Sequence, residues 1–283
     1  MGFNAFLERL IAGRWIAGAD ESDAITAALR FKRANINSII NYLGEEFTQM
    51  EEINSTVKKY IDLEAEIGKR RLGSDLSVKL TQLGMLVSRK ACHRNLDLIV
   101  KRAKTAGIFV WIDMEEENIV DRTIEEYLTE ASHGNVGICI QAYTLNSGEK
   151  LRRVVRAGGI VRLVKGAYPL SEDTFRTRRE ITRNYGRLML YLFRNSKRFT
   201  IATHDIALVE KAIRYNIKYK KDVTYAMLNG VRNRYLKALA EKGYKTAVYL
   251  PFGEKWIDYS YRRLKEAGHA TIILKSLFER QGV

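Results

Sequence analysis

Short runs rich in valine, isoleucine and tyrosine alternate along the chain with longer runs in which apolar residues recur at helical spacing. In residues 94–107, RNLDLIVKRAKTAG, the terminal Gly107 predicts the end of a helix before the next apolar run. Residues 147–159 repeat this design, and we expect Ser147 to be the N-cap and Gly158 the helix stop. The strand-like runs are residues 35–43, 75–83, 108–115, 135–143, 159–168, 199–205, 222–228 and 246–252.

Nearly continuous apolar strands that alternate with helices indicate a parallel sheet covered on its outer face. These runs number eight, which closes a barrel, so we predict an α/β protein with a (β/α)8 TIM-type barrel over residues 35–283. Helical segments near residues 3–17 and 21–31 would form an N-terminal extension, residues 1–34. A doubly wound open sheet is the alternative, but no predicted strand is followed by a GxGxxG or GxxxxGK[ST] phosphate loop.

Composition agrees with one large domain: the 283 residues are 46% hydrophobic and 29% charged. Cys92 and Cys139 lack CxxC spacing, so we expect free thiols, which suits a reducing cytosol. The N-terminal segment reads as an amphipathic helix rather than a secretory signal, and no uninterrupted apolar stretch reaches the roughly 18 residues of a membrane span. We therefore expect a cytoplasmic protein.

The formal net charge of +15 requires an explanation. Its basic residues are spread over many predicted helices, without a single basic arm, which favours a solvated, lysine-rich surface. An anionic membrane is the next interpretation, with peripheral contact on its inner face, and we do not expect nucleic acid as a partner.

Polar residues gather where the predicted strands end. In barrels of this type the chemistry lies at the carboxyl ends of the strands, where the loops to the helices begin. Core strands have no reason to end in so many polar groups unless they line a wet, functional cavity, although strand ends are also where solvent begins. These residues are Lys79, Asp113, Gln141, Arg162, Lys165, Thr203, His204, Asp205 and Tyr249.

The stretch VKGAY, residues 164–168, contains a glycine that lets the backbone pass close to a flat or bulky group. Arg162 and Lys165 are three residues apart, and a bend at Gly166 could bring both to the mouth of the barrel. Two cations there suit a phosphate, or a flavin whose reduced ring carries negative charge. Asp113 ends an apolar strand, and we expect it to pair with Lys79 or with an arginine. The following acids, residues 115–117, read as the start of a helix.

The residues at these strand ends also suit two other chemistries. His204, Asp205 and Asp113 could ligate one divalent ion, but the remaining histidines, His93, His133 and His269, form no HxH or HExxH motif, so we expect no metal. A Schiff-base lysine at Lys79 or Lys165 would instead make a barrel lyase or aldolase.

Arg262 and Arg263 are adjacent on a helix predicted to follow the last strand. Such a pair is ordinarily a solvated helix face. A helix that covers the mouth of the barrel, however, could direct both guanidinium groups into it. Paired arginines suit a carboxylate, because each can form bidentate, charge-assisted hydrogen bonds.

Several of these stretches together resemble the proline dehydrogenase family, especially its short monofunctional forms. They occur in family order from the first strand to the last helix, and the most specific are RLVKGAY and the final tyrosine and arginine pair. The matching stretches are LGE (43–45), SVKL (77–80), IDMEE (112–116), QAY (141–143), RLVKGAY (162–168), ATHD (202–205), MLNG (227–230), VYLPFG (248–253) and YRRLKE (261–266).

The resemblance implies a flavoenzyme that transfers a hydride from Cδ of L-proline to N5 of FAD, forming 1-pyrroline-5-carboxylate, with a quinone as the electron acceptor. It implies catalytic roles for Asp113 and Arg162 and a gate in which Glu45 pairs with the arginine helix. Proline would contact Lys79, Tyr249, Arg262 and Arg263. FAD would contact Met114, Gln141, Arg162, Lys165, Gly166, Ala167, Thr203 and His204.

The seventh strand departs from the family pattern. The family usually carries FEFQ before ML and a tyrosine in MLYG, whereas this chain has VTYAMLNG over residues 223–230. Thr224, Ala226 and Asn229 therefore replace an acid, an amide and an aromatic residue. These replacements leave open whether a proline analogue is preferred, and a barrel lyase or a non-catalytic basic binding protein remain the alternative functions.

Overall fold

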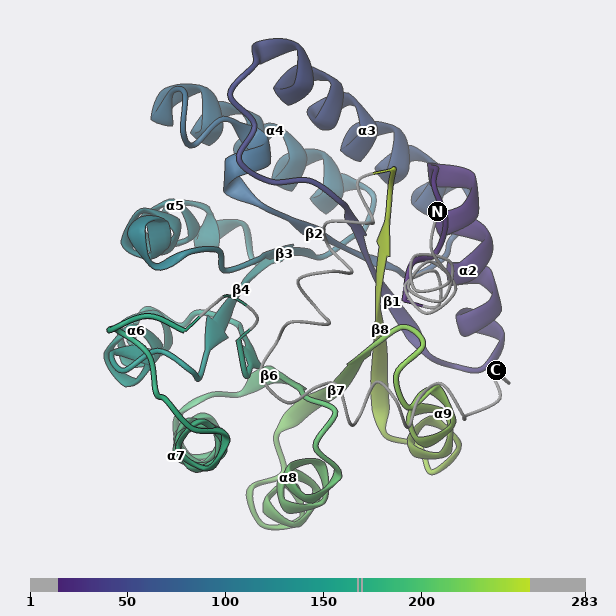
Figure 1. Cartoon of the computed structure of the whole chain (residues 1–283). Helices are drawn as coiled ribbons and strands as arrows, with labels where there is room; N and C mark the ends of the chain where they lie inside the picture. The colour runs from purple at the N-terminus through teal and green to yellow at the C-terminus, as the bar shows by residue number, and fades with distance from the viewer. Residues whose placement is uncertain (1–14, 167, 169, 255–283) are drawn as a thin grey trace, which may run out of the picture.

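The computed structural model describes residues 15–166, 168 and 170–254, in which eight parallel strands form a closed barrel in chain order (Figure 1). The barrel closes where the first strand pairs with the last, from Asn37 beside Ala247 to Tyr42 beside Phe252. The predicted TIM-type barrel is thereby confirmed. Its strands are β1 (Asn37–Tyr42), β2 (Asp75–Val78), β3 (Val110–Ile112), β4 (Val136–Gln141), β5 (Val161–Val164), β6 (Arg198–Ala202), β7 (Asp222–Leu228) and β8 (Lys245–Phe252).

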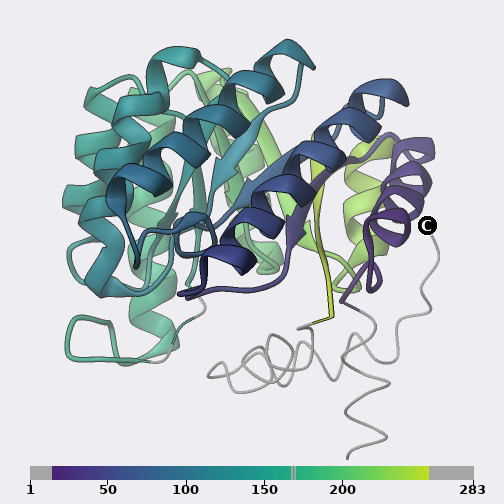
Figure 2. The same cartoon turned by 90° about the horizontal axis from the view of Figure 1, so that it is seen from above.

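The helices surround the barrel and cover its outer face, as both views show (Figures 1 and 2). Each helix turns an apolar face inward; on α7, for example, Tyr185, Leu188, Met189 and Leu192 are buried. The α-helices are α2 (Glu21–Arg33), α3 (Met50–Lys69), α4 (Arg89–Thr105), α5 (Val120–Glu130), α6 (Ser147–Arg156), α7 (Arg178–Asn195), α8 (Ile206–Tyr219) and α9 (Asn233–Glu241), and the short 3-10 helices are η1 (Leu80–Leu83), η2 (Glu117–Ile119) and η3 (Ala131–His133).

The predicted helix stops agree with the structure, whereas the predicted N-cap of α6 does not. Gly107 and Gly158 follow α4 and α6 in the left-handed region, with φ of +68° and +76°, as a glycine stop requires. Ser147 is not the N-cap of α6, which is Asn146. The Ser147 hydroxyl donates to the carbonyl oxygen of Thr144 at 2.7 Å, so it is engaged with the preceding turn rather than with the helix.

The N-terminal extension is described only in part. Helix α2 has the capping box of Asp20 and Asp23, and its Ala24 and Phe31 belong to the same hydrophobic core as the barrel helices. The proposed boundary after residue 34 falls in the turn between α2 and β1. Residues 15–17 are not helical, and the rest of the helix predicted near residues 3–17 lies outside the described residues, as does the C-terminal helix with Arg262 and Arg263.

Several strands are shorter than the apolar runs that predicted them, among them the second and the third. The second stops at Val78 because the chain turns into η1, and the third stops at Ile112, where Asp113 leaves the strand. Both shortened ends carry polar side chains at the mouth of the barrel. The lumen is filled further down by a separate apolar cluster of Ile39, Phe109, Trp111, Ala226 and Ala247, so the barrel has one closed end and one polar end.

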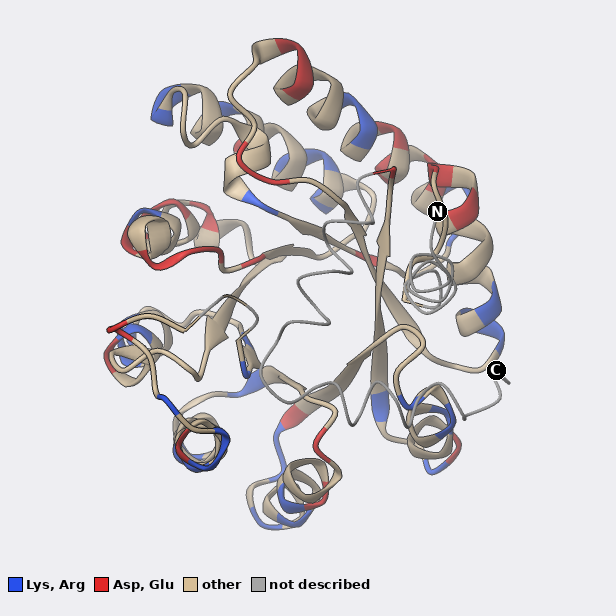
Figure 3. Ribbon diagram, in the orientation of Figure 1, with Lys and Arg blue, Asp and Glu red and all other residues tan. Residues whose placement is uncertain are grey.

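Charged residues lie mainly on the outer helices and their connections (Figure 3). Both cysteines are buried and free, as expected. Within the described ranges, no helix combines the length and apolarity that crossing a bilayer requires.

Candidate active site

Asp113 is the centre of a buried network at the mouth of the barrel. Its Oδ1 pairs with the Arg162 guanidinium and accepts a hydrogen bond from Ser77 Oγ at 2.9 Å. Its Oδ2 accepts a hydrogen bond from the Tyr249 hydroxyl at 2.7 Å. These partners come from β2, β5 and β8, so closure of the barrel brings them together. The sequence predicted that Asp113 pairs with Lys79 or an arginine, and the structure selects the arginine.

Arg162 lies in the lumen and is 3% exposed. Its Nη2 donates to Ser77 Oγ at 2.9 Å, its Nε donates to Cys139 Sγ at 2.8 Å, and its guanidinium lies over the Trp111 and Tyr249 rings at 5.2 and 5.3 Å. Burial alone lowers the pKa of Arg162, but Cys139 and the Asp113 carboxylate more than offset that effect and raise it. The guanidinium is thus a fixed positive charge.

Lys79 forms a second group at the mouth. Its Nζ donates to Glu45 Oε2 at 2.8 Å, and the Tyr168 hydroxyl donates to the same oxygen at 3.2 Å. Burial, followed by the Glu45 charge, raises the pKa of Tyr168, so its hydroxyl keeps its proton. The pairing of Glu45 with the arginine helix concerns residues outside the described part of the chain.

Glu115 precedes η2 and α5 and is not part of the helix start that the sequence predicts. It is 2% exposed, accepts a hydrogen bond from the Thr81 backbone N–H at 3.1 Å, and bonds the Thr81 hydroxyl. Burial raises the pKa of Glu115 to about 7, although the Lys79 charge lowers it. Acidic residues next to each other along the chain can therefore lie in different environments, since Glu115 is buried and Glu116 is exposed.

Lys165 and Arg162 do not converge as the bend at Gly166 suggested. Lys165 Nζ contacts Asp205 Oδ2 at 2.9 Å and Thr182 Oγ1 at 3.2 Å, whereas Arg162 points into the lumen. Gly166 is required at its position: its φ is +116°, and a Cβ would lie 2.2 Å from Cδ1 of Tyr143. Its backbone therefore approaches a ring, although that ring belongs to the protein.

Thr203 and His204 lie in the loop that follows β6. The Thr203 hydroxyl accepts a hydrogen bond from the Asp205 backbone at 3.2 Å. His204 Nε2 accepts one from the Leu228 backbone N–H at 2.9 Å, so the ring proton is on Nδ1. This bond joins the ends of β6 and β7 and fixes the orientation of the imidazole.

Oε1 of Gln141 and Nη1 of Arg162, both at the mouth, are among the buried polar atoms that have no hydrogen-bond partner among the described residues. Gln141 is nevertheless held in place, because its Nε2 donates to the Met114 carbonyl at 2.9 Å. Buried polar atoms without partners are rare in folded proteins. One acceptor and one donor therefore remain for a bound group with complementary atoms.

Sequence reasoning missed several members of the site. Ser77 and Tyr168 lie inside the stretches SVKL and RLVKGAY and were found by neither pattern nor resemblance, while Cys139 and Trp111 are apolar strand residues without a distinguishing signal. Ala167 lies outside the described residues. Of the departures on the seventh strand, Ala226 belongs to the apolar cluster in the lumen, so the smaller side chain is accommodated by core packing.

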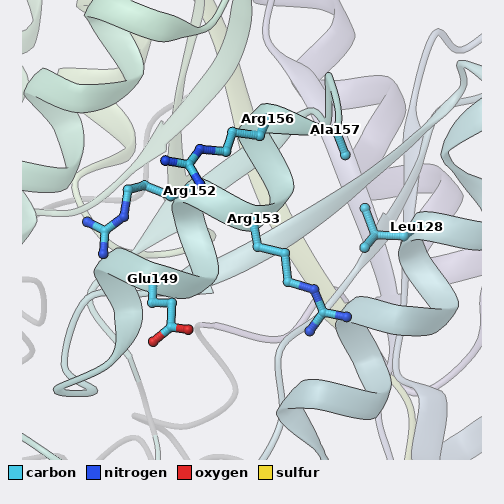
Figure 4. Close-up of a pocket in the computed structure, with 6 residues that line it drawn as sticks. All are labelled: Leu128, Glu149, Arg152, Arg153, Arg156 and Ala157. Atoms are coloured by element: carbon cyan, nitrogen blue, oxygen red, sulfur yellow. The ribbon is translucent and has the colours of Figure 1, made fainter.

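An open hollow of about 590 Å³ lies elsewhere, on the outer surface (Figure 4). It is lined by Leu128 of α5 and by Glu149, Arg152, Arg153, Arg156 and Ala157 of α6 and its end. None of the predicted site residues lines it. We therefore place the candidate active site at the mouth of the barrel, where the paired charges and the two unpartnered atoms are found.

Known proteins can be aligned with almost the whole chain. It is 29% identical over 282 residues to proline dehydrogenase 1 of Bacillus subtilis (strain 168), an alignment that covers 98% of this chain and 93% of the relative. It is 28% identical over 267 residues to the proline dehydrogenase of Deinococcus radiodurans, which covers 90% of this chain and 86% of the relative.

Solved structures share the fold. Proline utilization A (PutA) from Bdellovibrio bacteriovorus superposes with a TM-score of 0.84 at 22% identity, over 94% of this chain. The corresponding protein from Corynebacterium freiburgense gives a TM-score of 0.77 at 20% identity, over 99% of this chain. The chain spans only 34% and 33% of those two larger proteins.

The family model for proline dehydrogenase matches residues 24–275. This match extends from α2 past β8 and contains every residue of the buried network around Asp113. The chain therefore belongs to the proline dehydrogenase family of oxidoreductases.

Proposed function

We propose that the chain oxidises L-proline to 1-pyrroline-5-carboxylate with FAD as its cofactor. The observation that carries this proposal is the pair of buried, unpartnered atoms, Gln141 Oε1 and Arg162 Nη1, beside a charge-paired network at the mouth. A flavin ring has both donors and acceptors at its edge, and a cation suits the charge that it gains on reduction. The residues present therefore fit the group.

The residues that would hold FAD are Met114, Gln141, Arg162, Lys165, Gly166, Thr203 and His204, with Ala167 from outside the described residues. When bound, FAD supplies the acceptor for the hydride that leaves proline. The chain itself contributes orientation. The Ser77 and Tyr249 hydroxyls fix the Asp113 carboxylate, which in turn fixes the Arg162 guanidinium, so neither group has to reorganise during the reaction.

Lys79 and Tyr249 would contact the substrate. The Lys79 ammonium next to a secondary amine disfavours protonation of that amine, and a deprotonated nitrogen is what hydride loss from the adjacent carbon requires. The Tyr249 hydroxyl is directed by its bond to Asp113. By the same proposal, Arg262 and Arg263 bind the substrate carboxylate from the C-terminal helix, with Glu45 as their gate partner.

The alternative functions fit the site less well. A Schiff-base lysine must lose its charge before it attacks a carbonyl, whereas Lys79 and Lys165 lie 2.8 and 2.9 Å from carboxylate oxygens. A non-catalytic binding protein has no need of a buried ion pair in its lumen, because such a pair carries a desolvation cost without a matching gain in stability.

We also propose a membrane quinone as the electron acceptor, reached by peripheral contact with the inner face of the membrane. The basic outer surface supports this, including Arg152, Arg153 and Arg156 around the hollow on α6 (Figures 3 and 4). Binding to acidic liposomes that is released by salt would support it, because such attraction is screened within about 10 Å at 0.1 M. Equal binding to neutral liposomes would remove it.

The cofactor is tested on the purified protein. We expect one FAD per chain, an absorption band near 450 nm as flavoproteins have, and loss of that band when L-proline is added without oxygen. Arg162→Lys should lower the flavin content or alter its reduction potential. Arg198→Lys is the matched control, because Arg198 is also a β-strand arginine over an aromatic ring, Phe109 at 4.6 Å, but belongs to the opposite end of the barrel. Flavin-free wild type, or a band that proline leaves unchanged, would refute the proposal.

A further inference from the structure

A cluster of potential metal ligands lies outside the barrel, where α4 packs against α5 and η3. Asp97 lies on α4, Glu130 ends α5, and His133 ends η3. One ligand atom from each, the Asp97 and Glu130 carboxylate oxygens and a ring nitrogen of His133, lie within 4.8 Å of one another. His133 precedes β4 by three residues, so the cluster lies toward the end of the barrel opposite the mouth. Figure 1 shows α4 and α5 as neighbours.

The two separations from His133 to the carboxylates fit a tetrahedral ion. His133 Nε2 lies 3.4 Å from Glu130 Oε2 and 3.5 Å from Asp97 Oδ1. A tetrahedral zinc ion with bonds of about 2.0–2.1 Å has ligand atoms about 3.4 Å apart. Both contacts are longer than a good charge-assisted hydrogen bond, which is about 2.7–2.9 Å. The three side chains are thus spaced for an ion between them rather than for direct hydrogen bonds.

Glu130 provides an independent indication. Its side chain is 1% exposed, and Oε2 has no hydrogen-bond partner among the described residues. This oxygen is directed toward His133 and Asp97, and a buried carboxylate without donors is costly. A bound cation would supply the missing interaction.

Neighbouring residues leave the ligand atoms available. Lys101 Nζ contacts Oδ2 of Asp97 at 2.9 Å, so Oδ1 remains for a metal. His93 Nδ1 lies 3.4 Å from the other oxygen of Glu130, Oε1, and 3.2 Å from Glu126 Oε2. Hydrogen-bonding groups behind the ligands are typical of metal sites, because they fix ligand orientation.

We propose that Asp97 Oδ1, Glu130 Oε2 and His133 Nε2 bind one zinc ion, with water as the fourth ligand. One imidazole and two carboxylates favour zinc over magnesium or calcium, which prefer sites made only of oxygen. The ion would join α4 to the segment that leads into β4. It would stabilise the barrel wall and take no part in proline oxidation.

The test is isothermal titration of the full-length, chelator-treated protein with zinc chloride. We expect one zinc per chain, and at least about tenfold weaker binding in both Asp97→Asn and His133→Ala. Asp62→Asn is the matched control, because Asp62, like Asp97, is a helix carboxylate paired with a lysine four residues away, Lys58 at 2.6 Å. It should bind zinc as the wild type does. His93→Ala should keep one zinc per chain.

Two further measurements distinguish this site from zinc bound elsewhere. X-ray absorption should report one imidazole nitrogen, oxygen ligands and no sulfur. Zinc at about 100 times its Kd should raise the unfolding midpoint of the wild type by roughly 5–10 °C but leave that of His133→Ala nearly unchanged. Absence of zinc binding by the wild type, unchanged binding by Asp97→Asn or His133→Ala, or sulfur ligation would overturn the proposal.

Discussion

Asp113 at the mouth and Glu130 between the outer helices are both buried carboxylates, at 8% and 1% exposure, with opposite surroundings. Asp113 accepts from a serine, an arginine and a tyrosine that reach it from three strands. Among the described residues, the ion-pair partners of Glu130 are two histidine nitrogens 3.4 Å from its oxygens, and one of those oxygens lacks a hydrogen-bond partner. The mouth thus contains charges that are already compensated, while the outer helices contain one that still needs a cation.

The largest expected effect is a difference in stability between a variant that removes the partner of Asp113 and one that removes the charge of Glu130. Arg162→Met should lower the free energy of unfolding by about 3–5 kcal/mol, because it leaves the Asp113 carboxylate buried without its counter-charge. Glu130→Gln should not lower it, since it removes a buried charge that lacks donors. Urea unfolding of flavin-free protein in chelator measures both. An equal loss in the two variants would contradict the comparison.

The next largest effect is the pH dependence of the free energy of unfolding that Glu115 causes. Its folded pKa of about 7 lies above its ordinary value, so the folded state holds the proton more tightly. Its contribution to stability is therefore complete below about pH 4.5 and is lost as pH rises through 7. Relative to Glu115→Gln, the wild type should lose about 2.5 kcal/mol between pH 5 and pH 8. Urea unfolding at both pH values tests this, and a constant difference between the two proteins would refute it.

A smaller difference in the free energy of unfolding is expected between substitutions of Gly166, at the mouth, and of Gly107, after α4. Gly166→Ala should lower the free energy of unfolding by about 2 kcal/mol or more, because it combines a positive φ with a Cβ 2.2 Å from the Tyr143 ring. Gly107 has φ of +68° but no atom within 4 Å of an added Cβ, so Gly107→Ala should lower it by only about 1 kcal/mol. Thermal unfolding of both variants decides whether close packing, rather than backbone conformation alone, requires glycine at the mouth.

The smallest effect is expected where both members of a charge pair are exposed on the surface. Lys58 and Asp62 are 75% and 55% exposed, and their contact at 2.6 Å joins residues four apart on α3. Lys58→Ala should change the free energy of unfolding by no more than about 0.5 kcal/mol. A loss comparable to that of Arg162→Met would mean that burial is not what distinguishes the pairs.

Local patterns in the sequence determined the barrel. Apolar runs and glycine stops such as Gly107 and Gly158 depend on backbone conformation and on burial of each element, and both are properties of neighbouring residues. For the same reason the polar strand ends, including Lys79 and Asp113, could be found before any contact was known. The roles predicted for Arg262, Arg263 and Ala167 remain predictions, since those residues lie outside the described part of the chain.

The pairing of these residues was decided only by tertiary structure. Nothing near Asp113 in the sequence indicates that it contacts Arg162 rather than Lys79, or that Lys165 contacts Asp205, because barrel closure and register set those distances. Glu115 and Glu116 look equivalent in the sequence until packing buries the first. Likewise Asp97 and His133, 36 residues apart, approach to 3.5 Å only because α4 packs beside the end of α5. Electrostatic interactions depend on distance and burial in space, and sequence order specifies neither.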